Sequence, residues 1–163
     1  MPGTDGLRAA ELLAAARLLL EAAQDGRDSA PARRAVSTAY YTMFHCLARM
    51  CSDRLAVNRG VPLRSSTRQT VYRSLQHGRT KRRCINPRVI APYPTAIRAF
   101  ARGFAELQKK RHRADYDPST TFEVSEARES VDQAEELIRA LLAAPEADLR
   151  DFALRILLAE RED

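Results

Sequence analysis

The segment 111–116 (RHRADY) combines the residue types that bind anionic groups. An arginine guanidinium can donate two hydrogen bonds to one phosphate and keeps its charge at physiological pH. In this arrangement Arg111 would hold the phosphate and Asp115 would orient the arginine. Tyr116 would supply a hydroxyl or a ring that stacks on a base. His112 is the only nearby group that titrates near neutral pH.

This segment lies where the charge of the chain changes sign. Residues 64–113 hold fourteen Lys and Arg against one acid, whereas residues 114–163 hold five Arg against fourteen Asp and Glu. The basic residues are concentrated at 81–83 and at 109–113, the latter including Arg113. A block of this kind is either a solvated face or a surface that contacts a polyanion, and its local concentration favours the polyanion.

A second polar set lies earlier in the chain, at Arg34, Thr38, Tyr41 and His45. Spacings of four, three and four keep these side chains on one face of a helix. If that face meets the 111–116 turn, the two would enclose a ligand pocket with two arginines, two phenols and an imidazole. For His45 the alternative is a half-buried histidine that only satisfies a hydrogen bond.

Structural alternatives also exist for the 111–116 turn itself. Arg111 and Asp115 are four residues apart, so they can form a surface ion pair worth only ~0.3 kcal/mol on a helix. Tyr116 can equally be a helix-end residue that packs its ring on the protein. Both alternatives remain open from the sequence.

The elements that must position these residues are helices. Alanine, leucine and arginine dominate, glycine is scarce, and runs of β-branched residues are nearly absent. Apolar residues at helical spacing predict an all-α bundle of five or six helices. The expected helices cover 7–24, 30–51 with Ser29 as its N-cap, 65–78, 95–116, 123–142 and 146–160. Gly26, Gly78 and Asp117-Pro118 are the expected stops, and 53–66 and 79–94 are the expected loops. Gly103, isolated within a helix, is expected to allow close approach of another helix.

The chain length of 163 residues fits one domain, 1–163, with a core over about 7–142 and an extra C-terminal helix. Its apolar runs are too short for a membrane span, and its N-terminus does not resemble a signal peptide. Cys46, Cys51 and Cys84 show no CxxC spacing, so we expect buried, reduced thiols of a cytoplasmic protein. The three histidines lack companions at zinc spacing, and no metal or cofactor is expected.

Two motifs resemble those of small prokaryotic HEPN proteins. The segment 35–45 (AVSTAYYTMFH) resembles the AYYxMFH helix of that family, and 111–116 resembles its RxxADY segment. Their order and separation match as well, and the resemblance covers about residues 7–142. It implies a HEPN-like helical bundle that commonly forms a homodimer.

The resemblance also implies a function. Many HEPN domains are metal-independent endoribonucleases of toxin–antitoxin or phage-defence systems, with an Arg-x4-6-His signature that activates a ribose 2′-hydroxyl. In this chain Arg111 matches the arginine, and Tyr116 stands where the histidine is expected. The resemblance therefore implies RNA or nucleotide binding, with Arg111, Asp115 and Tyr116 as the catalytic candidates if the RNA is cleaved. The alternative is a non-catalytic interaction module whose partner is a protein such as a nucleotidyltransferase antitoxin.

Overall fold

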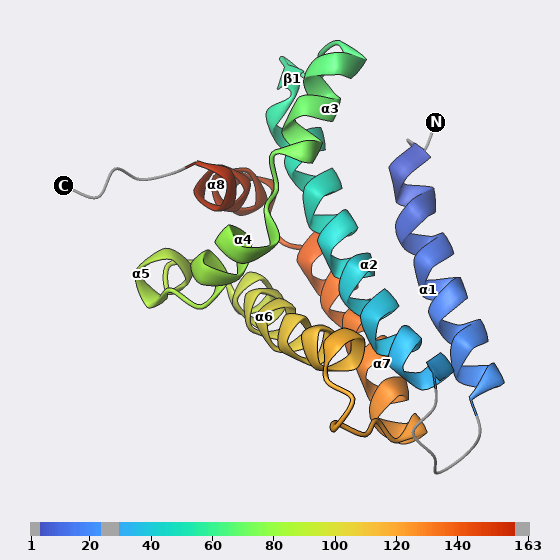
Figure 1. The fold of residues 1–163 in the computed structure, drawn as a ribbon. Coiled ribbons are helices and arrows are strands. Elements are labelled where there is room, and N and C mark those ends of the chain that lie inside the picture. The colour runs from blue at the N-terminus through green and yellow to red at the C-terminus, as the bar shows by residue number, and fades with distance from the viewer. Residues whose placement is uncertain (1–3, 24–29, 159–163) are drawn as a thin grey trace.

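The computed structural model describes residues 4–23 and 30–158, and the fold within them is all-α, as the sequence predicts. These ranges contain eight helices and one two-stranded hairpin (Figure 1). The elements are α1 (Thr4–Ala22), α2 (Ala30–Leu55), β1 (Val57–Asn58), β2 (Val61–Pro62), α3 (Ser65–Arg73), α4 (His77–Cys84), α5 (Pro87–Ile90), α6 (Thr95–Tyr116), α7 (Val124–Leu142) and α8 (Glu146–Leu157). No helix in the described ranges is long and apolar enough to cross a membrane.

Helix α2 is the centre of the fold. It packs against α1, α6 and α7 along its length, and against α3 and α8 (Figure 1). More than half of its 26 residues are buried, because neighbours cover it on several sides. Of the apolar stripe that the sequence predicts on this helix, Val36, Tyr40, Leu47 and Cys51 are buried, and Phe44 is partly buried.

The apolar stripes of α6 and α7 are also confirmed. The apolar residues that recur at helical spacing in the sequence of these two helices are all buried and belong to one cluster: Ile97, Phe100, Phe104 and Leu107 on α6, and Ala127, Val131, Ala134, Ile138 and Leu141 on α7. The helices approach closely at Gly103, where an added Cβ would lie 2.2 Å from Leu137 Cδ1. The prediction that Gly103 admits another helix is therefore confirmed.

Two predictions about the middle of the chain are wrong. The stretch 79–94 is not a loop, because it holds most of α4 and all of α5. The helix expected over 65–78 ends at Arg73, and Gly78 lies inside α4 instead of stopping a helix. Pro87 lies inside the stretch expected to be a loop, but it begins α5 at a position that needs no backbone N–H donor. These two short helices bring the count to eight.

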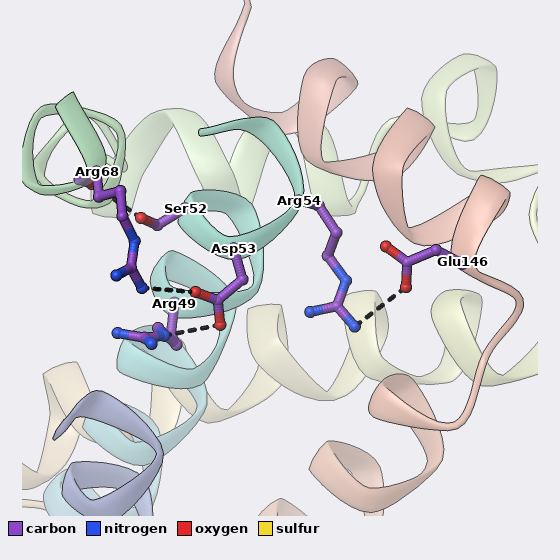
Figure 2. Close-up of polar contacts among 6 residues, drawn as sticks. All are labelled: Arg49, Ser52, Asp53, Arg54, Arg68 and Glu146. Carbon is purple, nitrogen blue, oxygen red and sulfur yellow. Dashed lines mark hydrogen bonds and ion pairs between the residues drawn. The ribbon is translucent and has the colours of Figure 1, made fainter. Parts of the chain in front are cut away.

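The stretch 53–66 is only partly a loop, because α2 continues to Leu55 and a short hairpin follows. Arg59 and Gly60 both have positive φ, at 50° and 80°, as a tight two-residue hairpin turn requires. Asp53, near the end of α2, accepts hydrogen bonds from Arg49 at 2.7 Å and from Arg68 at 3.1 Å; Arg68 belongs to α3, which follows the hairpin (Figure 2). These contacts fix α3 against the end of α2.

Helix α8 is joined to the same core. Its buried residues Leu149, Phe152 and Ile156 belong to the common hydrophobic cluster. Arg54 of α2 also forms an ion pair with Glu146, at 3.4 Å, at the start of α8 (Figure 2).

The three cysteines are free and buried, and burial raises the pKa of each thiol to about 12. The predicted cap Ser29 and the predicted stop Gly26 lie outside the described residues.

Candidate functional site

The 111–116 turn forms the last part of α6, and the chain leaves the helix where the sequence predicts. Asp117 adopts an extended conformation before Pro118, with φ −106° and ψ 101°. The Asp117 carboxylate then accepts hydrogen bonds from Ser119 and Thr120. These hydrogen bonds favour the charged carboxylate and lower the pKa of Asp117 to about 2.

Arg33 of α2 fastens this loop and the end of α6 to the rest of the protein. Its Nη1 donates to the carbonyl oxygens of Ala114 at 3.1 Å and Asp117 at 3.0 Å, and its Nη2 donates to the carbonyl oxygen of Thr120. Carbonyl groups at a helix C-terminus have no partner within the helix, so a fixed cation there is stabilising. Arg33 was not among the candidate residues, because its partners are backbone atoms about eighty residues away.

Arg111 is held in one orientation by Tyr41 and Asp115. Its Nη2 donates to the Tyr41 hydroxyl at 2.7 Å, and its Nε lies 2.9 Å from Asp115 Oδ2. The N–H bond at Nε is not directed at Oδ2, so this contact is an ion pair without a hydrogen bond. Ser37 donates to the same carboxylate oxygen at 3.2 Å. Because the side chains of Arg111 and Asp115 are only 18% and 14% exposed, the solvent-exposed ion pair considered above is not what forms.

Aromatic rings surround the Arg111 guanidinium. Its carbon lies 5.2 Å from the centroid of Tyr41, 5.6 Å from that of Tyr116 and 5.8 Å from that of Tyr40. A cation at this distance from a ring face is attracted by the electrons of the ring. Tyr116 is 65% exposed, so the alternative in which its ring packs on the protein is wrong. Its ring instead contacts His112 at 5.1 Å and is open to solvent.

These residues border a surface pocket of about 390 Å³ between the start of α2 and the end of α6, here called the Tyr116 pocket. Its lining includes Arg34, Tyr41, Arg111, Asp115 and Tyr116, so five of the eight candidate residues meet there. The guanidinium of Arg34 makes no hydrogen bond or ion pair with the described residues. Arg33, which is bonded to backbone carbonyl oxygens, also lines the pocket. The pocket therefore presents two fixed arginines and Arg34 beside an exposed phenol, which suits a phosphate group joined to a ring.

The remaining three candidates lie elsewhere. His45 does not line the Tyr116 pocket, because its Nδ1 shares a hydrogen bond with the Tyr72 hydroxyl and its ring stacks on Tyr72. The alternative role considered for His45, a satisfied hydrogen-bonding histidine, fits this geometry. His112 and Arg113 are exposed and line a second pocket, which shares Arg111 with the first.

His77 is a residue of the site that the sequence did not identify. It begins α4, stacks on Phe44 with ring centroids 3.9 Å apart, and shares a hydrogen bond with the Tyr40 hydroxyl. Its ring also meets the edge of Tyr41, the phenol bonded to Arg111. Burial, together with the charges of Arg111 and His45, lowers the pKa of His77, so a neutral imidazole supports the arginine. The sequence places His77 at the end of a helix expected over 65–78, whereas it begins α4, so no pattern placed it against α2.

No group of three or more His, Cys, Asp or Glu side chains that could hold a metal occurs in the described part of the chain. Comparisons with known proteins add no further assignment. No protein-family model matches the chain, and neither a curated protein nor a solved structure does.

Proposed function

We propose that the protein binds RNA or a nucleotide in the Tyr116 pocket, through a phosphate held by Arg34 and Arg111 and a base stacked on Tyr116. The observation that carries the proposal is the pairing of a fixed guanidinium with an exposed tyrosine ring in one pocket. Asp115 and Tyr41 orient Arg111 before any ligand arrives, so little side-chain entropy is lost on binding. The HEPN resemblance of segments 35–45 and 111–116 supports the same ligand class.

A direct binding assay tests this proposal. We would measure fluorescence anisotropy of a labelled adenine hexaribonucleotide with the wild type, Arg34→Gln and Tyr116→Ala. Loss of one stacked base costs ~1–3 kcal/mol, so Tyr116→Ala should weaken binding by at least about 5-fold. Arg34→Gln should weaken it by a similar factor, because it removes one phosphate contact. Neither residue supports the core, so both variants should keep the wild-type melting temperature.

The control for this assay is Arg102→Gln, which removes one positive charge from an exposed position of α6 outside both pockets. It corrects for the general attraction between a basic protein and RNA. If Arg34→Gln and Tyr116→Ala bind the hexanucleotide as tightly as Arg102→Gln does, the pocket is not the binding site and the proposal is wrong.

Cleavage can be read from the same samples by gel electrophoresis of the labelled RNA. The HEPN resemblance leads us to expect metal-independent cleavage, with Arg111 stabilising the charge that develops on the phosphate. EDTA should then leave the rate unchanged, and Arg111→Lys, which keeps the charge but loses the two-pronged donor, should lower it. A requirement for Mg²⁺ would contradict this mechanism, whereas tight binding with no cleavage would identify a binding module.

A second function is favoured by one observation, the number of internal contacts that Arg111 makes. Its hydrogen bond to Tyr41 and its ion pair with Asp115 are those of a residue that stabilises the fold. In this version the protein is an interaction module whose basic face docks an acidic partner such as a nucleotidyltransferase antitoxin. The hexanucleotide would then bind weakly, and Tyr116→Ala would not change its affinity.

The resemblance also implies a homodimer, which sedimentation equilibrium of the purified chain would test.

A further inference from the structure

A second pocket lies next to the proposed nucleotide site and is more basic than it. It has a volume of about 290 Å³ between α4 and α6, and its lining includes Lys81, Lys109, His112 and Arg113. We call it the Lys81 pocket. No carboxylate lines it, whereas Asp115 partly offsets the arginines of the Tyr116 pocket. Four cationic side chains, counting Arg111, therefore surround one small volume.

Apart from Arg111, which is paired with Asp115, these cations are not neutralised by acids in the described part of the chain. Within the described residues, Lys81 and Lys109 make no ion pair, and the Nε of Arg113 reaches only the Thr120 hydroxyl at 3.4 Å. By contrast, Lys110 points to the other side of α6, toward Glu126 at 3.8 Å and Ser130. Like charges held together repel one another, and an anion bound between them removes that repulsion.

The two pockets are connected through Arg111, which lines both. Helix α6 contributes residues to both pockets and packs against both α2 and α4. A ligand whose phosphate sits on Arg111 in the Tyr116 pocket therefore has the Lys81 pocket as its next site along the protein. A nucleotide with a single phosphate can place that phosphate in only one of the two pockets.

We infer that the Lys81 pocket binds a second phosphate of the same ligand, which is single-stranded nucleic acid with a backbone that crosses α6 at Arg111. This inference rests on the proposed function of the Tyr116 pocket. A single strand is required because a base can stack on Tyr116 only when it has left its own neighbours. A ligand that occupies both pockets must therefore have at least two phosphates.

Two ligands and two double variants test the inference. The ligands are 5′-AMP, with one phosphate group, and an adenine hexaribonucleotide, each titrated calorimetrically at several salt concentrations. The test variant is Lys81→Gln/Lys109→Gln. The control is Arg82→Gln/Arg102→Gln, which also removes one charge from α4 and one from α6 but touches neither pocket. The single variants Lys81→Gln and Lys109→Gln should each give about half the logarithmic effect.

The expected result is a loss confined to the longer ligand. Lys81→Gln/Lys109→Gln should bind the hexanucleotide about 10-fold more weakly than the control, with a salt slope shallower by about 1.4 for two lost contacts. It should bind 5′-AMP as the control does. If the two double variants bind the hexanucleotide equally, or if 5′-AMP binding falls as much as hexanucleotide binding, the inference is wrong.

The two proposals fail in different ways. If the wild type binds neither ligand, the proposed function itself is refuted, and this inference is refuted with it. If the wild type binds 5′-AMP and binds the hexanucleotide no more tightly, only the second phosphate site is refuted.

Discussion

Replacing Arg33 by methionine should weaken the fold at the point that positions Tyr116. The substitution removes three hydrogen bonds to the carbonyl oxygens of Ala114, Asp117 and Thr120, while a long apolar side chain remains to pack. A hydrogen bond from a charged donor contributes ~1.5–3 kcal/mol when buried. Arg33 is half-buried and water can reach part of the gap, so we expect a total loss of about 2–4 kcal/mol.

The neighbouring residue provides a matched control. Arg34→Met makes the same chemical change one position along α2, at an exposed guanidinium with no bond to the described residues. It should change the free energy of unfolding by less than about 0.5 kcal/mol, as surface substitutions usually do.

Urea unfolding followed by circular dichroism measures both variants, with tyrosine fluorescence as a second probe to verify two-state behaviour. A small domain is stable by about 5–15 kcal/mol, so Arg33→Met should remain folded without urea. If Arg33→Met and Arg34→Met unfold at the same urea concentration, the three carbonyl bonds do not hold the end of α6 and the reasoning is refuted.

Two further predictions concern packing and pH. Gly103→Ala should destabilise the protein by about 1 kcal/mol, because the new methyl group meets Leu137. In a Leu137→Ala background the same change should stabilise the protein by about 1 kcal/mol, because alanine is the better helix former. Urea unfolding measures both changes. If Gly103→Ala changes the free energy of unfolding in the same direction in both backgrounds, the contact with Leu137 is contradicted. The lowered pKa of His77 means that the unfolded chain binds more protons than the folded one below pH 6.5, so stability should fall as the pH drops below that value. In His77→Gln this loss between pH 7 and 5 should be smaller, measured as the difference in the free energy of unfolding, and an unchanged loss would show that other groups cause it.

The sequence predicted the long helices and their buried faces well, because both depend on local periodicity. The stripes of α6 and α7 repeat every three to four residues, and those residues are buried. Prediction failed over 77–90, where two short helices carry few apolar residues and lie among prolines. In α4 only Thr80 and Cys84 are buried, which is too short a pattern to recognise. Because α4 was not predicted, the position of His77 at its start was not predicted either.

For the candidate site, the sequence by itself determined that Arg111, Asp115 and Tyr116 share the end of one helix, and that Arg34 and Tyr41 share a face of another. A fixed helical geometry makes such relations calculable from spacing alone. Only the tertiary structure decided that the two faces meet, that Arg33 fastens the end of α6 and that Arg111 lies between two pockets. The rotation of each helix about its axis depends on packing between residues far apart in the chain, and no local pattern contains that information.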